Sequence, residues 1–142
     1  MININNKEEV VDILLQQKPL IIYYGESEWG PRALGNRSIL FDPRNPDAKN
    51  IVNKFKKREW WRPLAGTILL EYVHDYFDLG SLKESPYMSF AVHAKKKAIE
   101  EIPSIVHVDN TCRIQTLKKE DNPIYYNLKD IFYLYTHKKK DP

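Results

Sequence analysis

The apolar residues of this chain occur in short segments that alternate between the spacing of a helix and the spacing of a strand. Helical spacing is found at 6–18, 45–55 and 122–135, and strand-like runs cover 20–24, 64–72, 87–94 and 111–117. A short helix is expected near 73–77, directly after the second strand-like run. Segments mixed in this order are typical of a sheet packed by helices. The sequence therefore predicts an α/β fold with a twisted mixed β-sheet.

Local signals place the ends of the helices. Asn6 and Glu9 predict a capping box at the start of the first helix, since their side chains can satisfy each other's backbone donors. Asn45 is expected to cap the second helix, with Pro46 at its first position, where the missing N–H costs nothing. The buried side of that helix is expected to consist of Ala48, Ile51, Val52 and Phe55. The last helix is expected to bury Ile124, Leu128, Ile131, Phe132 and Tyr135.

Length and composition exclude several classes of protein. A chain of 142 residues fits one domain, and its net charge of +3 is too small to indicate a nucleic-acid or membrane-surface protein. It has no apolar run of the roughly 18–20 residues that a membrane span needs. Its one cysteine, Cys112, excludes an intrachain disulfide, and its four histidines are spread along the chain. We therefore expect a cytoplasmic domain with no membrane contact and no metal.

The loop from Glu28 to Ser38 is the first candidate for a functional site. Two glycines and a proline define its backbone path, and Arg32 and Arg37 lie five residues apart on it. The planar guanidinium group suits phosphates and carboxylates, and glycines let backbone N–H groups approach an anion. The alternative is a structural turn in which the arginines pair with acidic residues, namely Glu26, Glu28 or Asp42. The loop alone does not decide between the two interpretations.

The second candidate is the basic and aromatic segment 54–63. If its backbone is extended, Lys56, Arg58 and Arg62 point to one face, with Trp60 beside them. Such a face could hold a polyphosphate. The alternative is an ordinary solvated run of charges, although two tryptophans followed by Pro63 argue against simple exposure.

The third candidate is the segment 107–116. Arg113 and Gln115 share one face of the expected strand, and so would His107 and Asp109 if that part is extended. A histidine and an aspartate without a third ligand are a weak metal signal, and a histidine with a structural role is the more common case. Nothing in the sequence supports Cys112 as a nucleophile.

Together these segments closely resemble the C-terminal domain of the O-carbamoyltransferase family, which includes nodulation and antibiotic-tailoring enzymes. The resemblance covers roughly residues 8 to 137, and several motifs follow in the family's order. These motifs are Gly30–Leu40, Asp42–Arg44, Lys56–Pro63, Ser85–Met88, Ile102-Pro103, His107–Asp109, Thr111–Thr116 and Asn122-Pro123.

The resemblance implies a fold similar to threonylcarbamoyl-AMP synthase and a role in forming carbamoyl adenylate. The substrates would be ATP and carbamoyl phosphate, and an actin-like transferase domain or subunit with bound iron would pass the carbamoyl group to a hydroxyl acceptor. Matched by motif, Lys56 and Arg62 would be catalytic, and Arg32, Arg58 and Arg113 would bind substrate or nucleotide. Basic groups on rigid elements could stabilise charge developing at phosphorus.

The chain departs from the family in two places. The family usually has arginine where this chain has Glu26, and it continues past the position of Pro142 into a strand with a Ser-x-Asn motif. We therefore expect residues 1–142 to form a C-terminal carbamoyltransferase domain that lacks its last strand and is inactive without a partner chain. Two alternatives remain open: a non-enzymatic nucleotide- or phosphate-binding module and a nucleic-acid-binding domain.

Overall fold

A computed structural model describes residues 6–138 of the chain. Its elements in order are α1 (Lys7–Leu15), β1 (Leu20–Ile21), β2 (Ile39–Leu40), α2 (Ala48–Phe55), β3 (Ala65–Leu69), η1 (Leu70–Tyr72), α3 (Val73–Tyr76), β4 (Phe77–Asp78), β5 (Ala91–Ala94), α4 (Lys96–Glu101), η2 (Pro103–Ile105), β6 (Thr111–Leu117) and α5 (Pro123–Lys138). Within residues 6–138, no helix is both long enough and apolar enough to cross a membrane.

The central element is an open four-stranded sheet in the order β3-β6-β5-β4. Strand β3 runs parallel to β6, and the pairs β5–β6 and β4–β5 are antiparallel. A separate two-stranded ribbon joins β1 to β2. The predicted α/β fold with a mixed sheet is confirmed.

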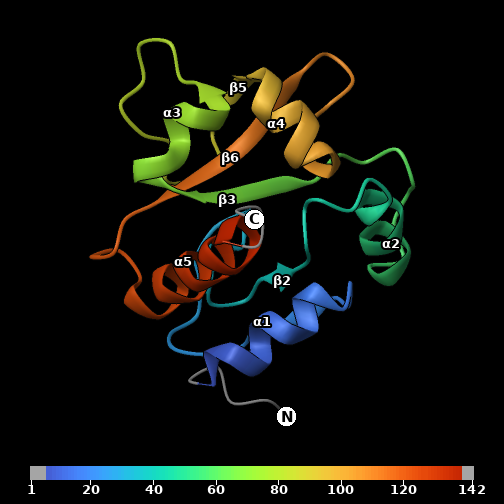
Figure 1. Cartoon of the computed structure of the whole chain (residues 1–142), viewed down its shortest axis with the longest axis vertical. Coiled ribbons are helices and arrows are strands. Elements are labelled where there is room, and N and C mark those ends of the chain that lie inside the picture. Colours follow the sequence, from blue (N-terminus) through green and yellow to red (C-terminus); the bar gives the residue numbers. More distant parts are fainter. Residues whose placement is uncertain (1–5, 139–142) are drawn as a thin grey trace.

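Helices cover both faces of this sheet (Figure 1). Helices α3 and α4 lie on one face, and α5 lies on the other, between β3 and α1. Each side has its own apolar core. One core joins α1, α5 and the ribbon, with Leu128 and Tyr125 of α5 almost fully buried in it, and the other contains Phe77, Cys112 and Ile114. Successive side chains of β6 point to opposite faces of the sheet, which explains why there are two cores. Cys112 and Ile114 face α3 and α4, while Leu117 faces α5.

Several predicted boundaries need correction. Strand β1 is shorter than the predicted run 20–24, and the sequence patterns do not predict its partner β2, nor β4, α4 and η2. The predicted strands 64–72 and 87–94 are also shorter, because residues 70–72 form the 3-10 helix η1 and pairing in β5 begins only at Ala91. Strands of two to four residues are too short to show the alternation of apolar and polar residues by which a strand is recognised in a sequence.

Helix α2 also differs from its prediction. It begins after Asp47 rather than at Pro46, and Phe55, expected in the core, is 48% exposed. The side chain that turns inward instead is Asn53, which is 1% exposed. On α5, Ile124 is at the margin of the core at 36% exposed, and the side chain of Tyr135 lies outside the described part of the chain.

Residues 56–62 do not have the extended backbone on which the polyphosphate interpretation of this segment depended. Helix α2 ends in a Schellman motif, in which the N–H of Lys57 bonds to the carbonyl of Lys54 and the N–H of Arg58 to that of Asn53. This motif places Lys57 in the left-handed region, with φ of 52°. The chain therefore reverses directly after the helix instead of continuing as a strand.

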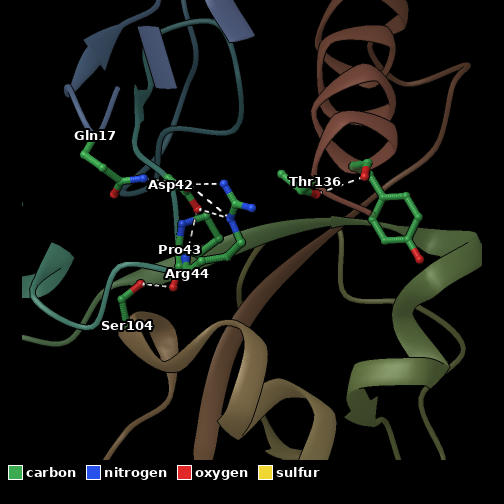
Figure 2. Close-up of polar contacts among 7 residues, drawn as sticks. Gln17, Asp42, Pro43, Arg44, Ser104 and Thr136 are labelled. Carbon is green, nitrogen blue, oxygen red and sulfur yellow. Dashed lines mark hydrogen bonds and ion pairs between the residues drawn. The ribbon is translucent and has the colours of Figure 1, made fainter. Parts of the chain in front are cut away.

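A buried carboxylate holds the connection between β2 and α2 (Figure 2). Asp42 is 0% exposed and accepts hydrogen bonds from the guanidinium and backbone N–H of Arg44 and from Gln17, at 2.6 to 3.1 Å. Burial alone would raise the pKa of Asp42, but these hydrogen bonds outweigh burial and hold it below its ordinary value. Next to it, Ser104 of η2 donates to the carbonyl of Pro43 at 2.9 Å. The connection is thus tied both to the end of α1 and to η2.

Candidate anion-binding site

A cavity of about 920 Å³ is lined by the sheet, by α5 and by the loops on either side of α2, and it extends to α3, α4 and η2. All five basic residues predicted from the motifs lie on its wall: Arg32, Lys56, Arg58, Arg62 and Arg113. They come from three separate segments, namely the glycine loop, the chain after α2 and strand β6. We call these five residues the basic cluster.

The glycine loop is built around the carboxylate of Glu28. Its two oxygens accept the backbone N–H groups of Leu34, Asn36 and Arg37 at 2.8, 3.1 and 3.2 Å. Three backbone donors of the loop are therefore already used within the protein and are not free to approach an anion.

The two arginines of the loop have different environments. The guanidinium of Arg37 donates to the carbonyls of Tyr24 and Gly25 and stacks on Tyr23, 3.8 Å from its ring centre. Arg37 thus has a structural role, though not through the acidic partners proposed from the sequence. Arg32 bonds only the carbonyl of Pro31, at 3.3 Å, among the hydrogen bonds of the described residues.

The glycine loop is fixed against the sheet by two buried side chains, the amide of Gln115 and the aromatic ring of Tyr125. Gln115 of β6 is 5% exposed and donates to the carbonyl of Leu34 at 3.0 Å. Gln115 also accepts from Thr67 of β3, which in turn accepts from the hydroxyl of Tyr125. Arg113 and Gln115 share one face of β6. This strand therefore carries Arg113 and, through Gln115, also fixes the loop that carries Arg32.

Replacing Gly35 with alanine is expected to destabilise the protein by about 2–5 kcal/mol. Gly35 has φ of 130°, and a Cβ there would lie 2.6 Å from Cδ1 of the buried Tyr125 ring. The cost combines backbone strain with overpacking. Urea unfolding measures it, with Gly30→Ala as the control, since Gly30 has a similar φ of 120° but a Cβ there would have no atom within 4 Å. Equal losses in both variants would contradict the argument.

The clearest sign of a ligand site is a pair of unsatisfied Nε–H donors on two arginines. The Nε atoms of Arg32 and Arg113 are both buried, and neither has a hydrogen-bond partner among residues 6–138. A buried donor without an acceptor costs about 1–3 kcal/mol, and more when it is charged. Burial, followed by the charges of Arg32 and Arg58, lowers the pKa of Arg113. This pair therefore favours an anionic acceptor in the cavity.

The residues that follow α2 add positive charge to the same wall. Burial and the charges of Arg58 and Arg62 lower the pKa of Lys56, and burial and Arg62 lower that of Arg58. Arg62 pairs with Glu59 at 2.8 Å, and both side chains are about half exposed. The mutual repulsion within the basic cluster is relieved when a multiply charged anion binds.

The remaining candidates from the third segment have structural roles. The ring of His107 lies 3.3 Å from both the carbonyl of Leu64 and the hydroxyl of Thr111, while Asp109 accepts from Thr111 in a tight turn. Across the described ranges, no three His, Cys, Asp or Glu side chains gather as metal ligands. Burial raises the pKa of Cys112 to about 12, so its thiol stays protonated.

This geometry defines a class: an α/β domain with a cavity lined by a basic cluster from three separate segments. The chain belongs to the carbamoyltransferase C-terminus family, whose model matches residues 11–139.

Individual relatives agree with this assignment. The chain is 40% identical over 128 residues to an uncharacterised protein of Methanocaldococcus jannaschii, covering 90% of this chain and 24% of that protein. It is 42% identical over 110 residues to nodulation protein NolO of Bradyrhizobium diazoefficiens, covering 76% and 20%. It is 40% identical over 111 residues to nodulation protein U of Sinorhizobium fredii, covering 78% and 20%. The chain thus spans about a fifth to a quarter of these relatives.

Proposed function

We propose that this domain binds ATP and carbamoyl phosphate and takes part in forming carbamoyl adenylate, from which a hydroxyl acceptor receives the carbamoyl group. The observation that carries the proposal is the pair of buried, unsatisfied Nε–H groups of Arg32 and Arg113 inside one basic cavity. Family membership supports carbamoyl transfer as the overall reaction. Both substrates carry phosphate, which guanidinium groups bind in a planar, two-point manner.

Within this proposal the basic cluster divides its work. Arg32, Arg58 and Arg113, which are partly buried, hold the phosphates. Water first hydrolyses carbamoyl phosphate to carbamate, releasing inorganic phosphate and a proton to solvent. A carbamate oxygen then attacks the α-phosphorus of ATP, the bond to pyrophosphate breaks, and carbamoyl adenylate forms. Lys56 and Arg62 are more exposed and stabilise the charge that develops in this second step. The attack on ATP needs no base, because the carbamate oxygen is already anionic.

A partner is part of the proposal, because the relatives are four to five times longer than the matched region. We propose that an actin-like transferase chain supplies the remaining elements and the acceptor site. Adenylate formation needs near-attack geometry, in which a displacement of about 1 Å can cost on the order of 100-fold in rate. Binding of an anion tolerates looser placement.

Isothermal titration of the purified chain with ATP and with carbamoyl phosphate tests the binding, and ATP–pyrophosphate exchange tests the chemistry. We expect weak binding of both ligands, lost in Arg58→Ala but kept in Lys54→Ala, since Lys54 lies at the end of α2 but not on the cavity wall. Exchange should need the partner chain. Absence of binding to both ligands would refute the proposal, and strong exchange by the chain alone would refute the need for a partner.

The same titration distinguishes the nucleic-acid alternative. If the basic cluster binds nucleic acid, affinity for an oligonucleotide should exceed that for ATP and fall steeply with salt. The chain's +3 charge and the confinement of the cluster to a cavity favour a small anion instead.

A further inference from the structure

Asn53 is a buried polar side chain that contacts two residues of the basic cluster. It lies in the last turn of α2 and is 1% exposed. Its Nδ2 group donates to the backbone carbonyls of Trp60 and Arg62 at 3.1 and 2.9 Å, and its Oδ1 accepts the Nε–H of Arg58. One side chain therefore touches a cluster guanidinium directly and holds the backbone of a second cluster residue.

The backbone of Asn53 reinforces this arrangement. Its carbonyl accepts the N–H of Arg58 at 3.0 Å, closing the Schellman motif that reverses the chain. The segment that follows contains no regular element until β3, so its path from 56 to 63 depends on a small number of polar contacts. Among the described residues, Asn53 supplies three of these contacts through one amide.

The chemistry of the site requires an amide at this position. Two donors and one acceptor are used at once, and asparagine is the short side chain that offers both kinds. Aspartate would keep the acceptor for Arg58 but lose both donors, and leucine of similar size would lose all three contacts.

We propose that Asn53 is a positioning residue that sets the guanidinium of Arg58 and the backbone of Arg62, and thereby the affinity of the basic cluster for a polyphosphate. The inference rests on the proposed function of the cavity. Asn53 does not line the cavity, so it acts through these neighbours and not by touching the ligand.

The test is titration of the whole chain with inorganic pyrophosphate. Asn53→Leu should weaken binding by about tenfold or more, since a charge-assisted hydrogen bond and two carbonyl contacts are lost. The matched control is Asn50→Leu, because Asn50 is exposed on the same helix and bonds only Asp47 among the described residues. That control should bind as the wild type does.

A double-mutant cycle separates positioning from general stability. If Asn53 acts through Arg58, the loss caused by Asn53→Leu should shrink to about threefold or less in an Arg58→Ala background. Full additivity, or wild-type affinity in Asn53→Leu, overturns this inference while leaving the proposed function standing. Failure of the wild-type chain to bind pyrophosphate overturns both.

A measurement on the wild-type protein covers the case in which Asn53→Leu does not fold. The Nε–H of Arg58 should give a resolved ¹⁵N–¹H NMR signal that exchanges slowly with solvent, assigned by its loss in Arg58→Lys. In Asn53→Asp, which keeps the acceptor, that signal should persist while pyrophosphate binding weakens. Exchange as fast as that of a free arginine in the wild type would overturn the positioning role.

Discussion

Replacing Arg113 with methionine is expected to weaken pyrophosphate binding by about 10- to 150-fold and, at the same time, to raise the melting temperature of the unliganded protein. The loss of affinity corresponds to one charge-assisted hydrogen bond of about 1.5–3 kcal/mol. The gain in stability follows from the partly buried position of Arg113, its unsatisfied Nε–H and the neighbouring charges of Arg32 and Arg58. Methionine keeps the apolar stem and removes the charge.

The opposite signs of the two effects make this prediction specific. A purely structural arginine would lose stability on the same change, and Arg37 serves as that comparison because its guanidinium donates to the carbonyls of Tyr24 and Gly25. Differential scanning fluorimetry should therefore show a higher melting temperature for Arg113→Met and a lower one for Arg37→Met. A lower value for both would show that Arg113 stabilises the fold rather than a ligand.

The second large effect is expected at Asp42, where Asp42→Asn should reduce the free energy of unfolding by about 2–4 kcal/mol. The variant keeps the shape but removes the buried charge that the guanidinium of Arg44, itself 39% exposed, contacts at 2.6 Å. Urea unfolding at neutral pH measures the loss. Asp47→Asn is the control, since Asp47 is exposed and the same change of charge there should cost about 0.5 kcal/mol or less.

The pH dependence of this loss has a defined sign. The folded-state pKa of Asp42 lies below its ordinary value of 3.8, so its contribution is complete above that value and disappears as the pH falls through the lower folded value. The difference between the wild type and Asp42→Asn should be constant from about pH 5 upward and shrink in stronger acid. A difference that stays the same at low pH would mean that packing, not charge, is responsible.

The parts of the fold that the sequence predicts best are those with long, regular patterns. The capped helix α1, the seven-residue strand β6 and the long helix α5 all follow from spacing and capping residues. The strands that the sequence does not reveal, β2 and β4, have two residues each and exist because a neighbouring strand supplies their hydrogen bonds. Pairing partners far away in the chain leave no local signal.

The candidate site shows the same division. The motifs predict five basic residues, and these residues line one cavity. Extended backbone does not bring them together, because the left-handed Lys57 reverses the chain between Lys56 and Arg58. Their roles in binding and catalysis stay predictions that the experiments above address.

The residues that hold the site together are harder to recognise in the sequence. Asn53 and Gln115 are polar residues that become buried through contacts with distant backbone groups, which composition and periodicity do not encode. The sequence offers one signal for Asn53, since it directly follows Val52 on the predicted buried side of the helix and precedes the basic and aromatic segment 54–63. Glu28 gives no such sign, because its partners are backbone N–H groups.

The pairing of β3 with β6 has a consequence for how the domain is made. Ala65 lies opposite Arg113, and Gln115 of the same strand reaches back 81 residues to Leu34. Contacts between such distant parts of a chain form slowly, because the chain must lose the conformational entropy of a long loop before these contacts can stabilise it. On the ribosome, Arg32, Lys56, Arg58 and Arg62 are all synthesised before the strand that completes their cavity. In a nascent chain these four basic side chains therefore stay exposed to solvent until strand β6 (Thr111–Leu117) has left the ribosome and paired with β3.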